Sequence, residues 1–398
     1  MVVLGLVFFH TARIFSLDPF YVSNAEKSYM ATAFVAWSVV WGMPLLFLVS
    51  GQAVWFSLRS RSPRQFLAER FRRLLMPFLF GLPLLVPPQL YCLLRSNPAY
   101  HESYGEFFLR FFRVVFRFDF PWFVAPHPDT MLFEAAHLYF LYYLFAFSVL
   151  ALPFLLYLKR ETGQRLVQRL ANFCQRPGVI LLLGLPIGVI EATLQSENYG
   201  GWNRYVFVVF LVYGYILASK TELVEAVRKQ TLPAALLAVS ATVFGFAVYA
   251  RAAQAGEYLG NGYALGNVLW RGLKGIGAWL WVVAFVGLSG KCLESTSRRL
   301  ATAGGGESLA GRALRYASEA ALPFYMLHQT IVVAVGFYVV QWRATVPVKY
   351  GAIALVSLGL TWALYELLVR RIPLLRVLFG MRPSRPSKPD GVSQQVVT

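Results

Sequence analysis

The sequence predicts an all-α, polytopic membrane protein with about ten transmembrane helices. Of its 398 residues, 57% are hydrophobic and only 14% are charged. Apolar runs of about 16 to 25 residues recur along the whole chain, and a helix of that length crosses a bilayer. One soluble core cannot cover so much apolar surface, so we expect a lipid bilayer to surround the helices.

Apolar runs bounded by charged residues, glycine or proline define ten candidate spanning helices. They cover residues 1–15, 34–57, 74–94, 135–158, 178–195, 204–219, 232–250, 267–289, 319–341 and 348–369. The first run is several residues short of the roughly 20 that span a membrane, and the fifth and sixth are also short. We expect one membrane domain over 1–380 and a disordered, proline-rich cytoplasmic tail at 381–398.

Lysine and arginine residues set the predicted orientation. Alternate connections carry six basic residues at 58–73, five at 159–177, three at 218–231, five at 290–318 and six after 369. Because basic connections stay in the cytoplasm, both termini are predicted to be cytoplasmic. Topology thus explains the net charge of +18. No nucleic-acid partner is expected, since such a binder would gather its basic residues on one water-facing surface.

The longest predicted external connection covers residues 95–134. Within it, EFFLRFFRVVFRFDFPWF at 106–123 places Arg110, Arg113 and Arg117 at i, i+3 and i+7, with phenylalanines around them. That pattern predicts one amphipathic helix lying in the membrane interface. Its arginines either anchor the helix to lipid headgroups or steer an anionic acceptor.

Two histidines stand inside apolar runs, where ionisable groups are costly and therefore candidates for function. His10 lies about two-thirds along the first run, and Arg13 follows it on the same helical face. His328, in ALPFYMLHQTIVV, has a similar predicted depth on the ninth run. An imidazole can take a proton from a hydroxyl and return it near neutral pH. The two histidines either share a polar cavity or each make a hydrogen bond between packed helices.

Four more polar residues lie near predicted outer helix ends. Glu134 and His137, at i and i+3, are expected to line the mouth of a cavity. The same ExxH spacing occurs in di-iron bundles, but the sequence has no second copy, so no metal site is expected. Arg271 and Lys274 either reach the membrane interface or hold a carboxylate or phosphate.

Arginines also gather at the predicted inner end of the third run. Arg70, Arg72 and Arg73 precede its apolar part. They either fix the orientation of the helix or grip an anionic donor in the cytoplasm, because guanidinium groups suit phosphates.

Several stretches taken together resemble the membrane acyltransferase family 3. They are FFHTARIF at 8–15, WGMPLLFLVSGQAVWF at 41–56, RFRRLLMPFLFGLPLL at 70–85, HLYFLYYLF at 137–145, ALPFYMLHQTIVV at 321–333 and YELLVRRIPLLRVLFG at 365–380, in the order of the family. This family includes O-acyltransferases of bacterial surface polysaccharides and the succinyltransferase of periplasmic glucans. The resemblance implies a ten-helix bundle with a central cavity in the bacterial inner membrane.

The resemblance also implies roles for single residues. The two family histidines match His10 and His328, which would be catalytic. His10 would be either the general base or a residue that is transiently acylated, and His328 would either orient His10 or bind the acceptor. The inner basic cluster of the family matches Arg70, Arg72 and Arg73, which would bind acyl-CoA, a co-substrate and not a tightly bound cofactor.

Four further residues are the expected contacts of a carbohydrate acceptor. They lie toward the outer side of the predicted bundle and are Arg13, Glu134, His137 and Arg271.

The leading motif of the family is only partly present. It consists of an arginine, ten intervening residues and a histidine, and counting back eleven positions from His10 runs past Met1. Eleven residues turn a helix by about 1100° and rise about 16 Å, so the arginine would lie on the face of His10, about half a bilayer lower. We expect the true start codon to lie upstream of Met1.

The predicted function is that of an acyltransferase, for groups other than amino-acyl groups. It would move an acetyl or succinyl-like group from cytoplasmic acyl-CoA to a hydroxyl of an extracytoplasmic carbohydrate. One alternative is a secondary transporter of an anionic or acylated glycan, although the two related halves common in transporters are not apparent. The other is an inactive family member, which the incomplete motif keeps open. The sequence has no Walker A loop and no GxSxG elbow.

Overall fold

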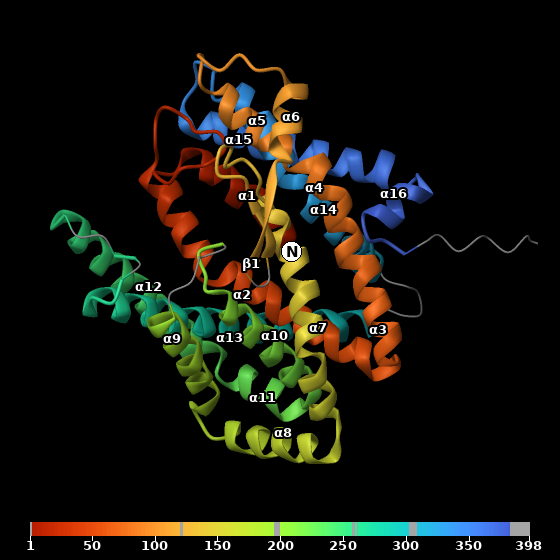
Figure 1. Cartoon of the computed structure of the whole chain (residues 1–398). Helices are drawn as coiled ribbons and strands as arrows, with labels where there is room; N and C mark the ends of the chain where they lie inside the picture. Colours follow the sequence, from red (N-terminus) through yellow and green to blue (C-terminus); the bar gives the residue numbers. More distant parts are fainter. Residues whose placement is uncertain are drawn as a thin grey trace, which may run out of the picture.

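The computed structural model describes residues 2–119, 122–194, 200–256, 259–260, 262–301 and 309–382. Its elements are α1 (Val2–Phe15), α2 (Tyr29–Ser60), α3 (Pro63–Arg70), η1 (Phe71–Leu75), α4 (Met76–Leu85), α5 (Pro87–Arg95), α6 (Tyr104–Phe111), β1 (Val114–Asp119), β2 (Trp122–Pro126), η2 (Ala136–Leu138), α7 (Tyr139–Lys159), α8 (Glu161–Cys174), η3 (Val179–Leu183), α9 (Gly184–Thr193), α10 (Arg204–Ser219), α11 (Thr221–Lys229), α12 (Thr231–Gln254), α13 (Leu265–Ala301), α14 (Leu309–Val339), α15 (Val346–Leu364), η4 (Tyr365–Val369) and α16 (Pro373–Leu378). Helices dominate the described residues (Figure 1), which confirms the predicted all-α class.

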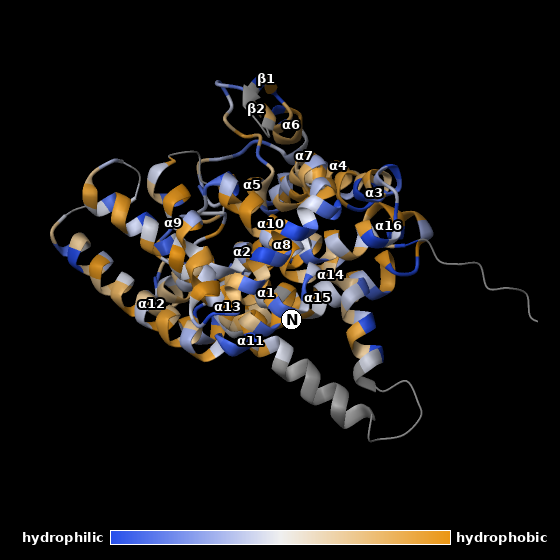
Figure 2. Cartoon of the chain, turned by 90° about the horizontal axis from the view of Figure 1, so that it is seen from below, coloured by the Kyte–Doolittle hydropathy of each residue, from blue (hydrophilic) through white to orange (hydrophobic). Residues whose placement is uncertain are grey.

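Each of the ten predicted runs coincides with a helix. In the described part of the chain, seven helices are long and apolar enough to cross a membrane. The count is eight if α10 and α11, bent by 107°, form one span, and α1 and η3–α9 are shorter apolar helices. Figure 2 shows apolar residues over most of these helices. The chain is therefore a multi-pass membrane protein, while the number of ten spans and the sides of the termini remain predictions.

The third predicted run, 74–94, begins in η1 and continues through α4 and α5, and α3 precedes it in the predicted basic connection 58–73. Between α4 and α5 two prolines interrupt the helix. The backbone N–H of Gln89 there donates a hydrogen bond to the carbonyl oxygen of Val86 instead of that of Leu85. The carbonyl of Leu85 then accepts hydrogen bonds from Gln89 Nε2 and from Thr330 Oγ1, each at 2.7 Å. Gln329 Nε2 donates to Gln89 Oε1, also at 2.7 Å. These polar bonds attach α5 to α14.

Glycines allow α2 and α10 to cross at close range. A Cβ atom at Gly51 would lie 1.9 Å from the carbonyl oxygen of Leu211, and one at Gly214 would lie 1.9 Å from that of Leu48. No side chain fits at either position, so the two backbones touch directly. Membrane helices commonly use small residues in this way.

Two of the predicted basic connections are themselves helices. Residues 159–177 contain α8, and residues 218–231 contain α11. The two lie side by side at the bottom of Figure 1, where Gln168 Nε2 donates to Glu222 Oε1 at 3.0 Å. Both are amphipathic and appear partly blue in Figure 2. Apolar side chains at helical spacing bury one face of each, which explains why these connections are ordered.

The prediction of a single interfacial helix over 106–123 is wrong in its second half. Only α6 is helical there, and β1 then pairs with β2 in an antiparallel hairpin in which Val115 faces Ala125. The β-branched residues Val114 and Val115 favour the extended strand over a continued helix. Arg117 consequently lies in a strand, and Arg110 forms an ion pair with Glu102. The three arginines do not share one helical face.

Candidate active site

Three histidines from separate parts of the chain meet inside the bundle. His10 comes from α1, His137 from η2 and His328 from α14. The ring centres of His10 and His328 are 5.1 Å apart, and those of His137 and His328 are 5.3 Å apart. We call these three residues the histidine cluster. The sequence predicted the approach of His10 and His328, but it placed His137 at an open mouth, whereas its side chain is buried.

Close helix packing brings the cluster together. A Cβ atom at Gly336 would lie 2.5 Å from Cδ1 of Ile14, so α1 and α14 approach each other closely one turn beyond His10 and two turns beyond His328. His137 enters from the other side, directly after Ala136, whose φ of 44° is unusual for a residue with a side chain. The hydroxyl of Tyr325 donates a hydrogen bond to the carbonyl oxygen of His137. The main chain of η2 is thus tied to α14.

Main-chain carbonyls fix which ring nitrogens carry hydrogen. Nδ1 of His328 lies 2.7 Å from the carbonyl oxygen of Tyr325 and 3.1 Å from that of Phe324. Nε2 of His137 lies 2.8 Å from the carbonyl oxygen of Met326. A carbonyl oxygen only accepts hydrogen bonds, so both of these nitrogens carry a proton. In the neutral rings, Nε2 of His328 and Nδ1 of His137 are therefore bare.

The bare nitrogens have no partner in the described structure. Nε2 of His328, Nδ1 of His137 and Nδ1 of His10 are all buried without a hydrogen bond. An unpaired buried polar atom costs about 1–3 kcal/mol, and most proteins avoid it. Three such atoms in three neighbouring side chains indicate a site that is built to receive protons or hydrogen-bond donors.

The connection from α1 to α2 covers the cluster with an aromatic ring. Phe20 stacks on His10 with ring centres 5.8 Å apart. The guanidinium of Arg13 lies 5.1 Å from the ring centre of Phe20. Its Nη2 donates a hydrogen bond to the carbonyl oxygen of Pro19 at 2.7 Å. His10 itself is half-buried. Arg13 and His10 therefore both contact the ring of Phe20.

Glu134 lies three residues before His137 and is held by a tyrosine. Its carboxylate accepts a hydrogen bond from the hydroxyl of Tyr21. Burial raises the pKa of the Glu134 carboxyl above its usual range, and the hydrogen bond from Tyr21 opposes that shift. Tyr21 follows Phe20 in the chain, so this bond also fastens the segment that covers His10.

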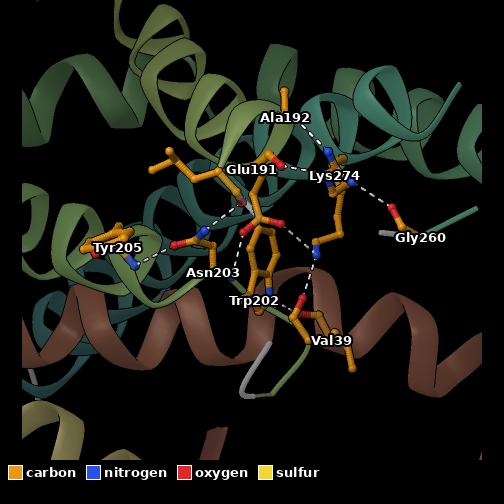
Figure 3. A network of polar contacts seen from close by, with 11 residues as sticks. Val39, Glu191, Ala192, Trp202, Asn203, Tyr205, Gly260 and Lys274 are labelled. Atoms are coloured by element: carbon orange, nitrogen blue, oxygen red, sulfur yellow. Dashed lines mark hydrogen bonds and ion pairs between the residues drawn. The ribbon is translucent and has the colours of Figure 1, made fainter. Parts of the chain in front are cut away.

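Arg271 and Lys274 belong to a different network, at the contact between α9 and α13. Figure 3 shows Lys274, Glu191 and Trp202 of this network. Lys274 Nζ forms an ion pair of 3.0 Å with the buried carboxylate of Glu191, and it lies 4.2 Å from the ring centre of Trp202. The backbone N–H of Asn203 donates to the same carboxylate at 2.8 Å. Sequence reasoning missed Glu191, although it is an acidic residue inside the predicted run 178–195 and the rule that singled out His10 and His328 applies to it.

The guanidinium of Arg271 binds main-chain carbonyl oxygens, whereas the sequence predicted a contact with the acceptor. Its guanidinium donates four hydrogen bonds of 2.9 Å to the carbonyl oxygens of Glu191, Ala192, Gly260 and Gly262. Four of the five N–H groups of an arginine are thereby used by the fold. The structure gives Arg271 the role of joining α9 to the segment before α13.

The three inner arginines lie close together in sequence and structure. Arg70 ends α3, where its guanidinium lies 4.9 Å from the ring centre of Phe66. Arg72 and Arg73 lie in the π-helical turn η1 and are exposed. Arg73 forms an ion pair of 3.6 Å with Glu69. No hydrogen bond or ion pair connects them to the histidine cluster among the residues that the structure describes.

Comparison with known proteins identifies the class of this membrane protein. A family model described as an acyltransferase domain matches residues 1–366. The chain therefore belongs to the membrane acyltransferase family 3, as the six sequence stretches suggested. The match includes all three members of the histidine cluster. No curated protein and no solved structure matches the chain significantly.

Proposed function

We propose that this protein transfers an acyl group, acetyl or succinyl-like, from cytoplasmic acyl-CoA to a hydroxyl of an extracytoplasmic carbohydrate in the bacterial inner membrane. One observation carries the proposal: an acyltransferase-family chain gathers three imidazoles in one place, and each has a buried nitrogen without a hydrogen-bond partner. Unpaired imidazole nitrogens suit the removal of a proton from a hydroxyl.

His10 is the proposed general base. It takes the proton of the acceptor hydroxyl while the hydroxyl oxygen bonds to the acyl carbon and the carbon–sulfur bond of the thioester breaks. The proton then passes to the leaving sulfur, so that the products are an ester and free CoA. His10 is the member of the cluster that no main-chain carbonyl holds and the one that is half-buried, which supports this choice. His328 lies beside His10 and keeps its own bare nitrogen available.

The donor is proposed to bind at the inner arginines. Arg72 and Arg73 are exposed, and Arg70 precedes them by less than one helical turn. Guanidinium groups match the phosphates of CoA in charge and geometry. Acyl-CoA would bind there as a co-substrate that leaves after each turnover.

The acceptor is proposed to approach from the side of Phe20. Arg13 and Glu134 lie on the segments that cover and flank His10, and an aromatic ring with neighbouring polar groups suits a sugar. In this proposal His137 lies too deep to contact the acceptor, and Arg271 is engaged elsewhere.

The first prediction concerns His10. A general base is typically worth 10²–10⁴-fold, so we expect His10→Ala to lower acyl transfer by about that factor while the protein still enters the membrane. Purified protein in lipid vesicles would be given labelled acetyl-CoA or succinyl-CoA and a polysaccharide from the cell envelope. Mass spectrometry of surface glycans with and without the gene identifies the product in cells.

The matched control is His101→Ala, which removes an exposed histidine that is not a member of the cluster. It should transfer acyl groups at the normal rate. Full transfer by His10→Ala would refute the assignment of His10. Movement of glycan across vesicles without acyl-CoA would instead favour a transporter.

A further inference from the structure

His137 lies next to His328 but has no part in the reaction as described above. Its ring is buried, one nitrogen is fixed by Met326, and the other is unpaired. Its backbone carbonyl accepts a hydrogen bond from Tyr325, and the residue before it has an unfavourable positive φ. A left-handed conformation at a residue with a side chain costs of order 1 kcal/mol, and such strain is common at functional sites. The fold therefore spends stability on the position of this imidazole.

We propose that His137 is a positioning residue that shares one proton with His328, so that the pair can hold the proton that His10 removes from the acceptor. The inference rests on the proposed function for the origin of that proton. The pairing of His137 with His328 itself rests on the geometry of the two rings.

Because one nitrogen of each ring already carries a hydrogen, the two remaining bare nitrogens can share one added proton. In the neutral state both rings present a bare nitrogen, and no hydrogen bond joins them in the described structure. Adding one proton to either bare nitrogen converts it into a donor, while the other remains an acceptor. A second proton would place two cations side by side in an apolar interior, which is strongly unfavourable.

The separation of the rings fits such a bond. In an N–H···N hydrogen bond the nitrogens are about 3 Å apart, and each nitrogen lies about 1 Å from its ring centre, so facing rings have centres roughly 5 Å apart. The observed distance between His137 and His328 is 5.3 Å. The ring planes stand at 81° to each other, so the rings must turn for the bare nitrogens to meet.

The proposed step keeps atoms and charge balanced. His10 takes the proton from the acceptor hydroxyl, and that proton moves to the bare Nε2 of His328, where Nδ1 of His137 accepts the resulting N–H. When the carbon–sulfur bond has broken, the same proton returns through His10 to the sulfur of CoA. No oxidant or other reactant is required, and the cluster ends neutral.

Other charged or titratable groups lie on the elements around the pair, and Arg13 and Tyr139 act on its neighbours His10 and Tyr325. α1 supplies His10 and Arg13, and α14 supplies Tyr325. Tyr139 comes from α7, and the carboxyl of Glu134 lies three residues before His137. The acidic side chain among these groups is Glu134, whose Oε1 accepts a hydrogen bond from Tyr21. The proton is therefore expected to be shared between imidazoles.

Nuclear magnetic resonance tests the pairing without any substrate. The full chain, labelled with ¹⁵N-histidine, would be placed in lipid nanodiscs, and its five histidines assigned with single variants. We expect His137 to carry hydrogen on Nε2 and His328 on Nδ1, and both rings to respond together to the uptake of one proton. Hydrogen on Nδ1 instead of Nε2 of His137 in the neutral state, or uptake of the first proton that changes the resonances of only one of the two rings, would overturn the proposal.

His137→Gln tests the role in turnover. A glutamine amide can replace Nε2 as donor to Met326, but it lacks the bare ring nitrogen, so the fold should be kept. With labelled acetyl-CoA as probe we expect kcat to fall about 10- to 100-fold at unchanged KM. The dependence of kcat on the fraction of heavy water in the solvent should indicate that more than one proton moves in the rate-limiting step of the parent protein. The same measurement should indicate only one moving proton in the variant.

The matched control is His127→Gln, a half-buried histidine outside the cluster. If His137→Gln had the same kcat as the control, or if as many protons moved in its rate-limiting step as in that of the parent protein, His137 would have no part in proton transfer. If His10→Ala transferred acyl groups normally while the resonance data showed the shared proton, the proposed function would fail and the pairing would stand.

Discussion

The unpaired nitrogens of the histidine cluster and the bonded guanidinium of Arg271 are two ways to keep an ionisable side chain inside an apolar fold. Arg271 donates hydrogen bonds to four carbonyl oxygens. The histidines can stay neutral, so they tolerate nitrogens without partners. The first arrangement stabilises structure, whereas the second leaves capacity for chemistry.

Arg271→Lys should therefore affect stability more than catalysis. A lysine has a single nitrogen and cannot reach four carbonyls that surround a planar guanidinium, and each abandoned buried carbonyl costs about 1–3 kcal/mol. We expect a clearly lower Tm by thermal denaturation in detergent and a normal transfer rate per folded molecule. Arg251→Lys, an exposed arginine in α12, is the matched control and should leave Tm unchanged. If Arg271→Lys had a normal Tm but its transfer rate no longer depended on the acceptor, Arg271 would be a substrate-binding residue.

At the scale of elements, two kinds of contact hold the helices that carry the site. Polar side chains fill the break between α4 and α5 and attach it to α14, next to His328. Glycines let the backbones of α2 and α10 touch. The polar contact depends on a carbonyl freed by proline, and the glycine contact depends on the absence of side chains.

Gly214→Ala tests the glycine contact. The added Cβ would meet the carbonyl oxygen of Leu48 at 1.9 Å, so α2 and α10 must separate. We expect a loss of about 1–3 kcal/mol or more, measured as a lower Tm and a lower yield of folded protein. Gly359→Ala is the control, because a Cβ there meets nothing within 4 Å in its helix and should be neutral or slightly stabilising. Equal Tm values for the two variants would contradict the crossing.

At the scale of the whole molecule, the apolar runs predicted the positions of helices better than they predicted the connections. An apolar run is covered either by protein or by lipid, so the formation of its helix depends little on contacts with distant parts of the chain. The hairpin β1–β2 and the helix α8 depend on local pairing and on packing against other elements, which a run length does not contain. The meeting of His10 and His328 followed from equal predicted depth. The inclusion of His137 could not be predicted, because it depends on the turn at Ala136 and on the carbonyl of Met326.

The orientation of the chain is the last prediction, and it belongs to the molecule as a whole. If the basic connections face the cytoplasm, α8 is inside and the segment before α6 is outside. In a variant without the natural cysteines, a membrane-impermeant maleimide applied to intact cells should label His101→Cys and leave Arg165→Cys unlabelled until the cells are opened. Both positions are exposed in the fold, so accessibility of the side chain is matched. The opposite labelling pattern would place the inner arginines on the side away from cytoplasmic acyl-CoA, and the proposed donor site would then be untenable even if the histidine cluster were catalytic.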